Sequence, residues 1–242
     1  MDIATLESPA KDHVTTTLLH GRGTQLQQPE FGLVLPDSPN RNQTEQFVAS
    51  RFHEAYGASI IEFFPLLLCR KDAGNISSVL GLRTGTQRPL FLEQYLDRDL
   101  ESEIFRLTGS QVGREQLVEI GNLSSAGRFG SQLLFILLTA ILAEAEFEWV
   151  VFTATRQIRQ LLCRLQFVPV TLCAADPGRL LNKQQVWGSY YQSKPEVQAG
   201  KIAAGLEILQ NNPVTAALLD QYSQEIKALA SALSQYRDQQ DA

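Results

Sequence analysis

One acid and an unusually small, polar loop distinguish the segment VEIGNLSSAGRFGSQLL, residues 118–134, from an ordinary strand exit. Glu119 lies between Val118 and Ile120 in a β-prone run. If its side chain faces a cleft, burial should raise the pKa of the carboxyl, and a raised pKa suits proton transfer near neutral pH. The alternative is a carboxylate that is satisfied by a neighbouring strand or by an arginine.

Two further segments carry side chains that could do chemistry. Glu93 stands in the hydrophobic segment LFLEQYLD, where it could orient a substrate or, as we favour, form a structural pair with Arg83. Tyr190 and Tyr191 in WGSYY could supply a phenolic acid, although we expect stacking or core packing for at least one of them. Cys163 lies on an amphipathic helix and is expected to pack. No G-x-S-x-G motif supports hydrolase chemistry.

The composition limits the class of protein. The chain has 242 residues, of which 44% are hydrophobic and 19% charged, as in ordinary soluble globular proteins. Its formal charge of -5 argues against a general nucleic-acid binder. The N-terminus lacks a secretory pattern, and the charge-free run 129–143 is too short to cross a bilayer. Three cysteines without a CxxC pair and three scattered histidines favour a cytoplasmic location and no metal site.

The pattern of elements predicts an α+β protein with a three-layer α/β arrangement. KDAGN between two apolar runs indicates a hairpin, and a strand, a helix and a second strand over 116–155 indicate a right-handed parallel crossover. We expect a disordered tail over 1–12, a core domain over 13–205 and a helical extension over 206–242. Strands are expected at 14–19, 31–35, 63–69, 77–82, 116–122, 148–155 and 168–172, and helices at about 42–57, 100–107, 130–146 and 156–167.

The C-terminal extension carries a short heptad stripe. Its apolar residues alternate at spacings of three and four, as in a coiled-coil seam, but over fewer than three heptads. We expect a terminal helix that packs on its own domain, with a homodimer seam as the alternative. The stripe consists of Leu219, Tyr222, Ile226, Leu229, Leu233 and Tyr236.

Six ordered segments resemble the thermostable hemolysin family over roughly residues 45–205: RFHEAYGA, LGLRTG, LFLEQYLD, VEIGNLSSAG, WVVFTAT and WGSYYQSKPEVQAGKI. That family is similar to the GNAT-type acyl-CoA N-acyltransferases, which implies a GNAT-like fold with a mixed central sheet flanked by helices. LGLR and VEIGN also resemble two stretches of acyl-homoserine-lactone synthases. Arg83 and Glu119 match there, whereas Asn122 stands where those synthases have arginine.

The resemblance implies an acyltransferase. It would move an acyl group longer than acetyl from acyl-CoA or an acyl carrier protein to an amine, by direct attack on the thioester. Glu119 is then the expected base, and Tyr190 and Glu93 are the further candidates for catalytic roles. The substrates are expected to contact Arg83, Trp187 and Tyr191.

The same resemblance assigns the donor to the loop after Glu119. A pantetheine arm could pair with a splayed strand edge, and free N–H groups at a helix start favour phosphate. The usual GNAT loop, [Q/R]-x-x-G-x-[G/A], is not reproduced, so a loop that serves packing alone is the alternative. The expected donor contacts are Asn122, Leu123, Ser124, Arg128, Gly130 and Ser131.

Two other classes of function remain open at this point. The family name suggests a membrane-active cytolysin, and the incomplete glycine motif suggests a GNAT-like binding module without catalysis. Arg156 and Arg159 share a helix face that could dock an acidic acyl carrier protein, with a solvated face as the alternative.

Overall fold

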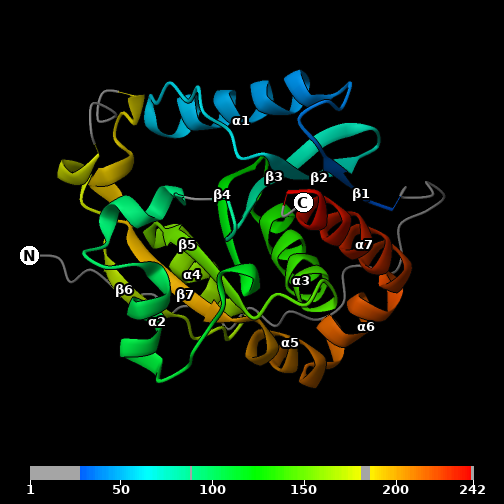
Figure 1. Ribbon diagram of the computed structural model, residues 1–242. Coiled ribbons are helices and arrows are strands. Elements are labelled where there is room, and N and C mark those ends of the chain that lie inside the picture. The colour runs from blue at the N-terminus through cyan, green and yellow to red at the C-terminus, as the bar shows by residue number, and fades with distance from the viewer. Residues whose placement is uncertain (1–27, 88, 181–185, 241–242) are drawn as a thin grey trace, which may run out of the picture.

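A computed structural model describes residues 28–87, 89–180 and 186–240, so the tail and the strand expected at 14–19 lie outside the described residues. Seven strands form one mixed sheet in the order β1-β2-β3-β4-β5-β7-β6 (Figure 1), in which only β4 and β5 are parallel. The strands are β1 (Glu30–Val34), β2 (Leu66–Asp72), β3 (Asn75–Thr84), β4 (Leu117–Ser125), β5 (Trp149–Ala154), β6 (Val170–Ala174) and β7 (Glu196–Lys201).

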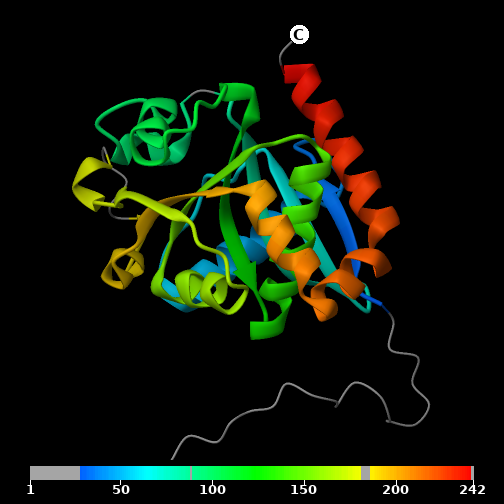
Figure 2. The same cartoon turned by 90° about the horizontal axis from the view of Figure 1, so that it is seen from below.

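The helices cover both faces of this sheet, which confirms the three-layer prediction. On one face α3, α5 and α7 lie side by side (Figure 2), with α4 beside them. On the other face lie α1, and a 3₁₀ turn, η1, that leads into α2. The helices are α1 (Arg41–Tyr56), α2 (Leu100–Thr108), α3 (Arg128–Glu144), α4 (Arg156–Arg164), α5 (Ile202–Asn211), α6 (Pro213–Gln221) and α7 (Ser223–Gln240); the 3₁₀ turns include η1 (Phe91–Tyr95), η2 (Arg114–Gln116), η3 (Pro177–Arg179) and η5 (Tyr190–Ser193).

Alternation along the strands builds the two apolar layers. Leu66 and Leu68 of β2 pack toward α3, whereas Leu67 and Cys69 pack toward α1. Successive residues of a strand point to opposite faces, so a strand that is covered on both faces has an unbroken run of apolar residues in its sequence. The expected hairpin is confirmed: β2 and β3 are joined by Ala73 and Gly74, both with positive φ.

The sheet splits where its two parallel strands end. β4 and β5 pair from Leu117 and Trp149 only as far as Ile120 and Phe152. Beyond that point β4 pairs with β3, and β5 pairs with β7. Two residues of β4 stand opposite one residue of β3 just past the split, and the first of them, Asn122, has a φ of 50°. Such a bulge bends a strand, so it directs β4 away from β5.

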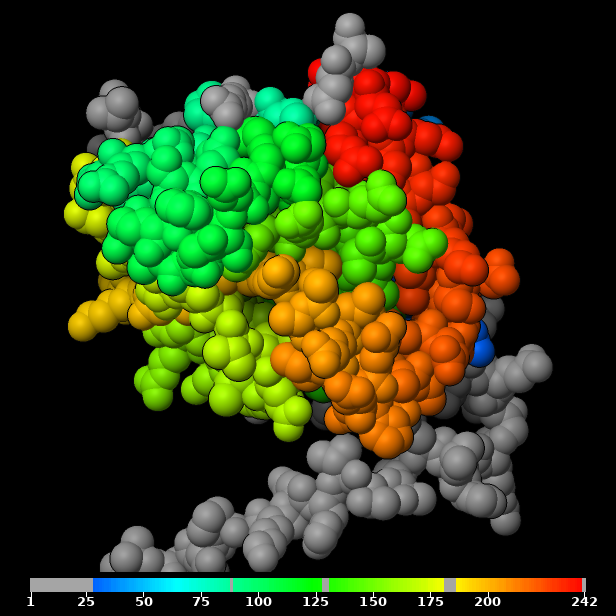
Figure 3. Space-filling model, turned by 60° about the horizontal axis from the view of Figure 1, so that its bottom comes forward, coloured from blue at the N-terminus to red at the C-terminus, as the bar shows by residue number. Residues whose placement is uncertain are grey.

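The C-terminal helices belong to the main core. Ile226, Leu229 and Leu233 of the heptad stripe are buried against α3 and the sheet, which confirms packing on the same domain. The space-filling view shows α5, α6 and α7 as a continuous band along one side of the molecule (Figure 3). These buried residues are therefore not available for the seam of a homodimer.

Candidate functional site

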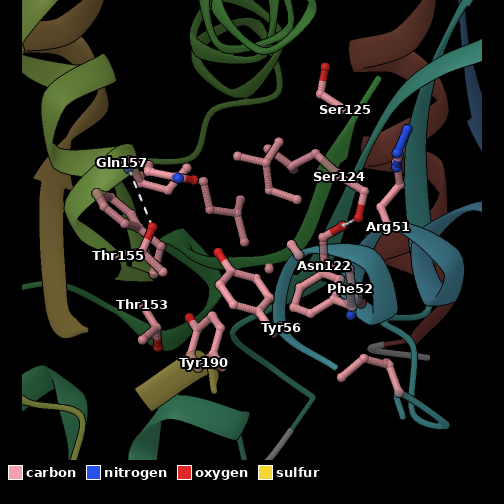
Figure 4. A pocket seen from close by; sticks show the side chains of 18 of the residues that line it. Arg51, Phe52, Tyr56, Asn122, Ser124, Ser125, Thr153, Thr155, Gln157 and Tyr190 are labelled. Atoms are coloured by element: carbon pink, nitrogen blue, oxygen red, sulfur yellow. Dashed lines mark hydrogen bonds between the residues drawn. The ribbon is translucent and has the colours of Figure 1, made fainter. Parts of the chain in front are cut away.

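A cavity of about 1080 Å³ opens at the split between β4 and β5. Side chains from α1, β4, β5, α4 and the segment around η5 surround it (Figure 4). Glu119 and Ile120, which are neighbours in β4, both line the cavity although they point to opposite faces of the sheet. The cavity therefore has two parts, joined through the split.

The first part lies on the α3 side and is apolar. Ile120 belongs there to the same core as α3 and α4. The other apolar side chains that line this part are Leu80, Phe135, Phe152, Ile158 and Leu161. We call this region the apolar lobe.

The second part lies on the α1 side and contains Glu119, whose side chain is only 2% exposed. Each carboxylate oxygen accepts one backbone hydrogen bond from η1: Oε2 from the N–H of Phe91 and Oε1 from the N–H of Leu92, both at 2.9 Å. Burial raises the pKa of Glu119 to about 7, and the charge of Arg83 and these two N–H groups oppose the increase. We call this region the polar lobe.

Arg83 stands beside Glu119 on the same face, because the two residues are register partners in β3 and β4. Its guanidinium lies 4.8 Å from the centre of the Phe64 ring, in a cation–π contact. The Phe64 side chain rests on Gly81 and Gly121: an added Cβ would come within 2.8 Å of the Phe64 Cβ at Gly81 and within 2.8 Å of the Phe64 ring at Gly121. Within the described residues no hydrogen bond or ion pair fixes the Arg83 guanidinium, so it can bind a ligand anion.

The predicted donor loop also lines the cavity. Gly127 precedes the first residue of α3 and, as a glycine, has no side chain to cap that helix start. Ser131, in the first turn of α3, lines the cavity, as do Asn122, Leu123 and Ser124. Arg128 and Gly130 lie in the same first turn as backbone. The structure thus brings a helix N-terminus to the end of the cavity, as an anion site requires.

Asn122 supports the wall of the cavity. Its Oδ1 accepts a 2.8 Å hydrogen bond from the N–H of Phe64. The carbonyl of Phe64 accepts a 2.7 Å bond from the buried guanidinium of Arg41. Both backbone groups of Phe64 are thereby hydrogen-bonded, which keeps its side chain against Gly81 and Gly121.

The expected pair between Glu93 and Arg83 is wrong, because Glu93 binds Arg114. The two nitrogens of Arg114 lie 2.6 and 2.7 Å from the two carboxylate oxygens of Glu93. Glu93 does not line the cavity. Arg114 comes from the turn just before β4, far along the chain from β3, which the local pattern around Glu93 could not indicate.

Aromatic side chains form the far wall of the polar lobe. Trp187, Tyr190 and Tyr191, which sequence analysis singled out, all line the cavity. The hydroxyls of Tyr191 and Tyr95 are 2.5 Å apart, and burial raises the pKa of Tyr191 to about 12. Burial also raises the pKa of Tyr190 strongly. The buried indole N–H of Trp187 has no hydrogen-bond partner within the described part of the chain.

Tyr56 was not predicted to belong to the site. It lies at the end of α1, and its ring extends into the middle of the cavity (Figure 4). Burial raises the pKa of Tyr56, and the Thr155 side chain opposes this increase. The motif RFHEAYGA contained the residue, but its helical position indicated only an apolar face.

The basic face on α4 is only partly free. Arg156 is exposed, whereas Arg159 donates 3.2 Å hydrogen bonds to the carbonyls of Ala154 and Lys194. Arg159 also lies 3.5 Å from Glu196. Arg164 of the same helix lines the cavity, as does Arg51 of α1.

The described residues contain no group of three or more His, Cys, Asp or Glu side chains placed to hold a metal ion. Over the same residues, every helix is too short or too polar to cross a bilayer. The expectation that Cys163 packs is wrong: its free thiol belongs to an exposed residue on the outer face of α4, outside the cavity lining.

Two solved structures share this arrangement of sheet and helices. FeeM, an N-acyl amino acid synthase from uncultured soil microbes, is 14% identical, with 80% of this chain and 97% of that chain covered and a TM-score of 0.52. The acyl-homoserine-lactone synthase LasI is 8% identical, with 72% and 90% covered and a TM-score of 0.50. The fold is therefore GNAT-like, as the resemblance implied.

The sequence profile described as thermostable hemolysin matches residues 34–206. The chain thus belongs to the thermostable hemolysin family, which confirms the resemblance of the six segments. No curated protein is significantly similar to it in sequence.

Proposed function

We propose that this protein is an acyltransferase that moves an acyl group from a CoA or carrier-protein thioester to an amine. One observation carries the proposal: the buried carboxylate of Glu119 stands at the split between β4 and β5, inside a large cavity. A base with a pKa of about 7 can accept a proton from an amine near neutral pH. The open cavity also argues against a binding module whose cleft has closed.

The two lobes suit the two substrates. The apolar lobe, with Phe135, Phe152 and Leu161, can bury an acyl chain, which favours chains longer than acetyl. The strand edge that opens past Ile120 offers backbone groups to an extended pantetheine arm. The start of α3 offers N–H groups to phosphate. The thioester would then lie at the split, beside Glu119.

Glu119 and Tyr56 have separate roles in proton transfer. Glu119 accepts the proton of the attacking amine, while the new C–N bond forms at the thioester carbon and the C–S bond breaks. Tyr56 donates a proton to the departing thiolate, because its hydroxyl lies in the middle of the cavity. Tyr190 is the alternative donor, but it is enclosed by the rings of Phe52, Trp187 and Tyr191.

The polar lobe favours an acceptor that carries a carboxylate as well as an amine. Arg83 adjoins Glu119 and its guanidinium can bind a carboxylate. FeeM, whose fold is similar, is described as an N-acyl amino acid synthase. We therefore propose an amino acid, or a compound of that class, as the acceptor.

Docking of a carrier protein at Arg156 and Arg159 stays a prediction. Arg51 and Arg164 line the cavity and so lie closer to an incoming donor. The family's name supports a different function, lysis of membranes, which needs no acyl donor. Dye release from liposomes by micromolar purified protein would support that alternative.

The test is thiol release from acyl-CoA and acyl-carrier-protein donors of two to fourteen carbons, with amino acids compared against the same compounds lacking the carboxylate. We expect transfer to amino acids, and a loss of about 100-fold or more in Glu119→Gln. Glu207→Gln, an exposed site on α5 outside the cavity, is the matched control and should retain activity. Wild-type protein that releases no thiol with any pair, or Glu119→Gln at the wild-type rate, would refute the proposal.

A further inference from the structure

The base Glu119 is held by a turn rather than by neighbouring strands. Both of its hydrogen bonds come from the backbone N–H groups of Phe91 and Leu92, the first two residues of η1. Backbone donors cannot be changed by substituting their own side chains. Their position therefore depends on whatever fixes η1 against the sheet.

An ion-pair cluster fixes η1. Glu93, in the middle of the turn, makes a bidentate ion pair with Arg114, in which two guanidinium nitrogens lie 2.6 and 2.7 Å from the carboxylate oxygens. The Glu93 carboxylate also accepts a 2.8 Å hydrogen bond from the N–H of Leu90. Arg114 is 8% exposed and donates to the carbonyl of Gly85, at the end of β3, and to Glu101 of α2 at 3.0 Å. The cluster thus joins η1 to β3, to α2 and to the residues that precede β4.

We propose that Arg114 and Glu93 are positioning residues for the base: their ion pair holds η1 so that the N–H groups of Phe91 and Leu92 stay directed at the Glu119 carboxylate. This inference rests on the proposed function, in which Glu119 is the base. It gives a role to Glu93, an acid that does not line the cavity. An arginine fork binds a carboxylate in one plane, so it fixes the turn more narrowly than a single contact would.

The electrostatic consequence has a definite sign. The charged groups that face Glu119 are Arg83 from β3 and Glu93 from η1, with the phenol of Tyr95 near them. The two N–H groups favour the ionised carboxylate, as Arg83 does. A looser turn would weaken those two bonds and raise the pKa of Glu119. A role in stability alone would leave that pKa unchanged.

Arg114→Lys is the informative substitution, because it keeps every charge of the cluster and removes the fork. The chain offers a matched control in Arg106→Lys: Arg106 binds Glu103 through two nitrogens at 2.6 and 3.1 Å, but on the exposed surface of α2. If Arg114→Lys does not fold, Glu101→Gln weakens the cluster more gently, because it removes one negative charge that Arg114 contacts and leaves an acceptor oxygen. That variant should change the Glu119 titration in the same direction by a smaller amount.

The experiment measures the Glu119 titration without using activity. In full-length protein labelled with ¹³C at the glutamate carboxyls, the Glu119 signal is the one lost in Glu119→Gln. We expect its midpoint near pH 7 in the wild type, the same in Arg106→Lys, and higher by at least about half a unit in Arg114→Lys. The amide signals of Phe91 and Leu92 should follow the same midpoints.

A folded Arg114→Lys variant with the wild-type midpoint would overturn the inference, as would an equal shift in Arg106→Lys. Kinetics give a second readout: the pH profile of kcat should move with the titration, while KM for the acyl donor stays unchanged. If the wild type transfers no acyl group, the proposed function fails. The titration then still decides whether the cluster positions Glu119.

Discussion

Removing the charge of Arg83 should make the base Glu119 harder to ionise. Burial raises the pKa of Glu119 to about 7, and among the groups that oppose this increase Arg83 has the largest effect. A nearby opposite charge lowers a carboxyl pKa by about 1–3 units, so with the low end of that range Arg83→Met should move the midpoint from about 7 to about 8. At pH 7 the ionised fraction then falls from about one half to about one tenth. The rate should therefore fall about fivefold at pH 7 and recover almost fully by pH 9.

The assay is kcat from pH 6 to 9 with a saturating amine that has no carboxylate, so that loss of acceptor binding does not contribute. An arylamine is suitable, because its own low pKa keeps it unprotonated over this range. Lys227→Met, at an exposed position of α7, removes one positive charge far from the cavity and is the control. A deficit of equal size at every pH would refute the reasoning, since it would show that Arg83 does not act on the ionisation of Glu119.

Two further predictions concern proton affinity and proton donation. The pKa of Glu119 is about 7 in the folded protein, against an ordinary value of 4.5, so the folded protein holds this proton more tightly than the unfolded chain does. The free energy of unfolding should therefore fall by about 3 kcal/mol as the pH rises from 4.5 to 7, and it should stay at the lower value above pH 7. Denaturation at pH 5 and pH 8 should show that loss in the wild type but not in Glu119→Gln; an equal loss in both would contradict it. Tyr56→Phe should lower kcat by about 10-fold or more at unchanged KM, whereas Tyr190→Phe should have the smaller effect, and steady-state kinetics that reverse this order would reassign the proton donor.

Local patterns predicted the parts of the site that are continuous in the sequence. The segment from Glu119 through Ser124 to the start of α3 follows from an apolar run, a small-residue loop and an apolar helix, and the structure has these elements in that order. Burial of Glu119 also follows locally, because its neighbours Val118 and Ile120 are core residues. Each of these features depends on residues close together in the chain.

Features that depend on distant partners were not predictable in the same way. The sequence pattern did not predict β7, which pairs antiparallel with both β5 and β6 and separates them. Its sequence, EVQAGK, lacks the apolar run that marked the other strands. As a result β5 and β6 are not neighbours, and the second strand–helix–strand unit does not form a parallel pair. The link from Glu93 to Arg114 is missed for the same reason, since it joins positions 21 residues apart.

Asn122 shows how one residue can serve the wall of a site rather than its chemistry. Asparagine adopts positive φ more readily than most residues, and at 50° it sits in the bulge that directs β4 away from β5. Its amide oxygen meanwhile holds the N–H of Phe64, whose ring supports Arg83. An arginine at this position, which the resemblance to lactone synthases would imply, has no side-chain acceptor for that N–H. Asn122 therefore fixes the wall that supports Arg83, the group that opposes the raised pKa of Glu119 most strongly.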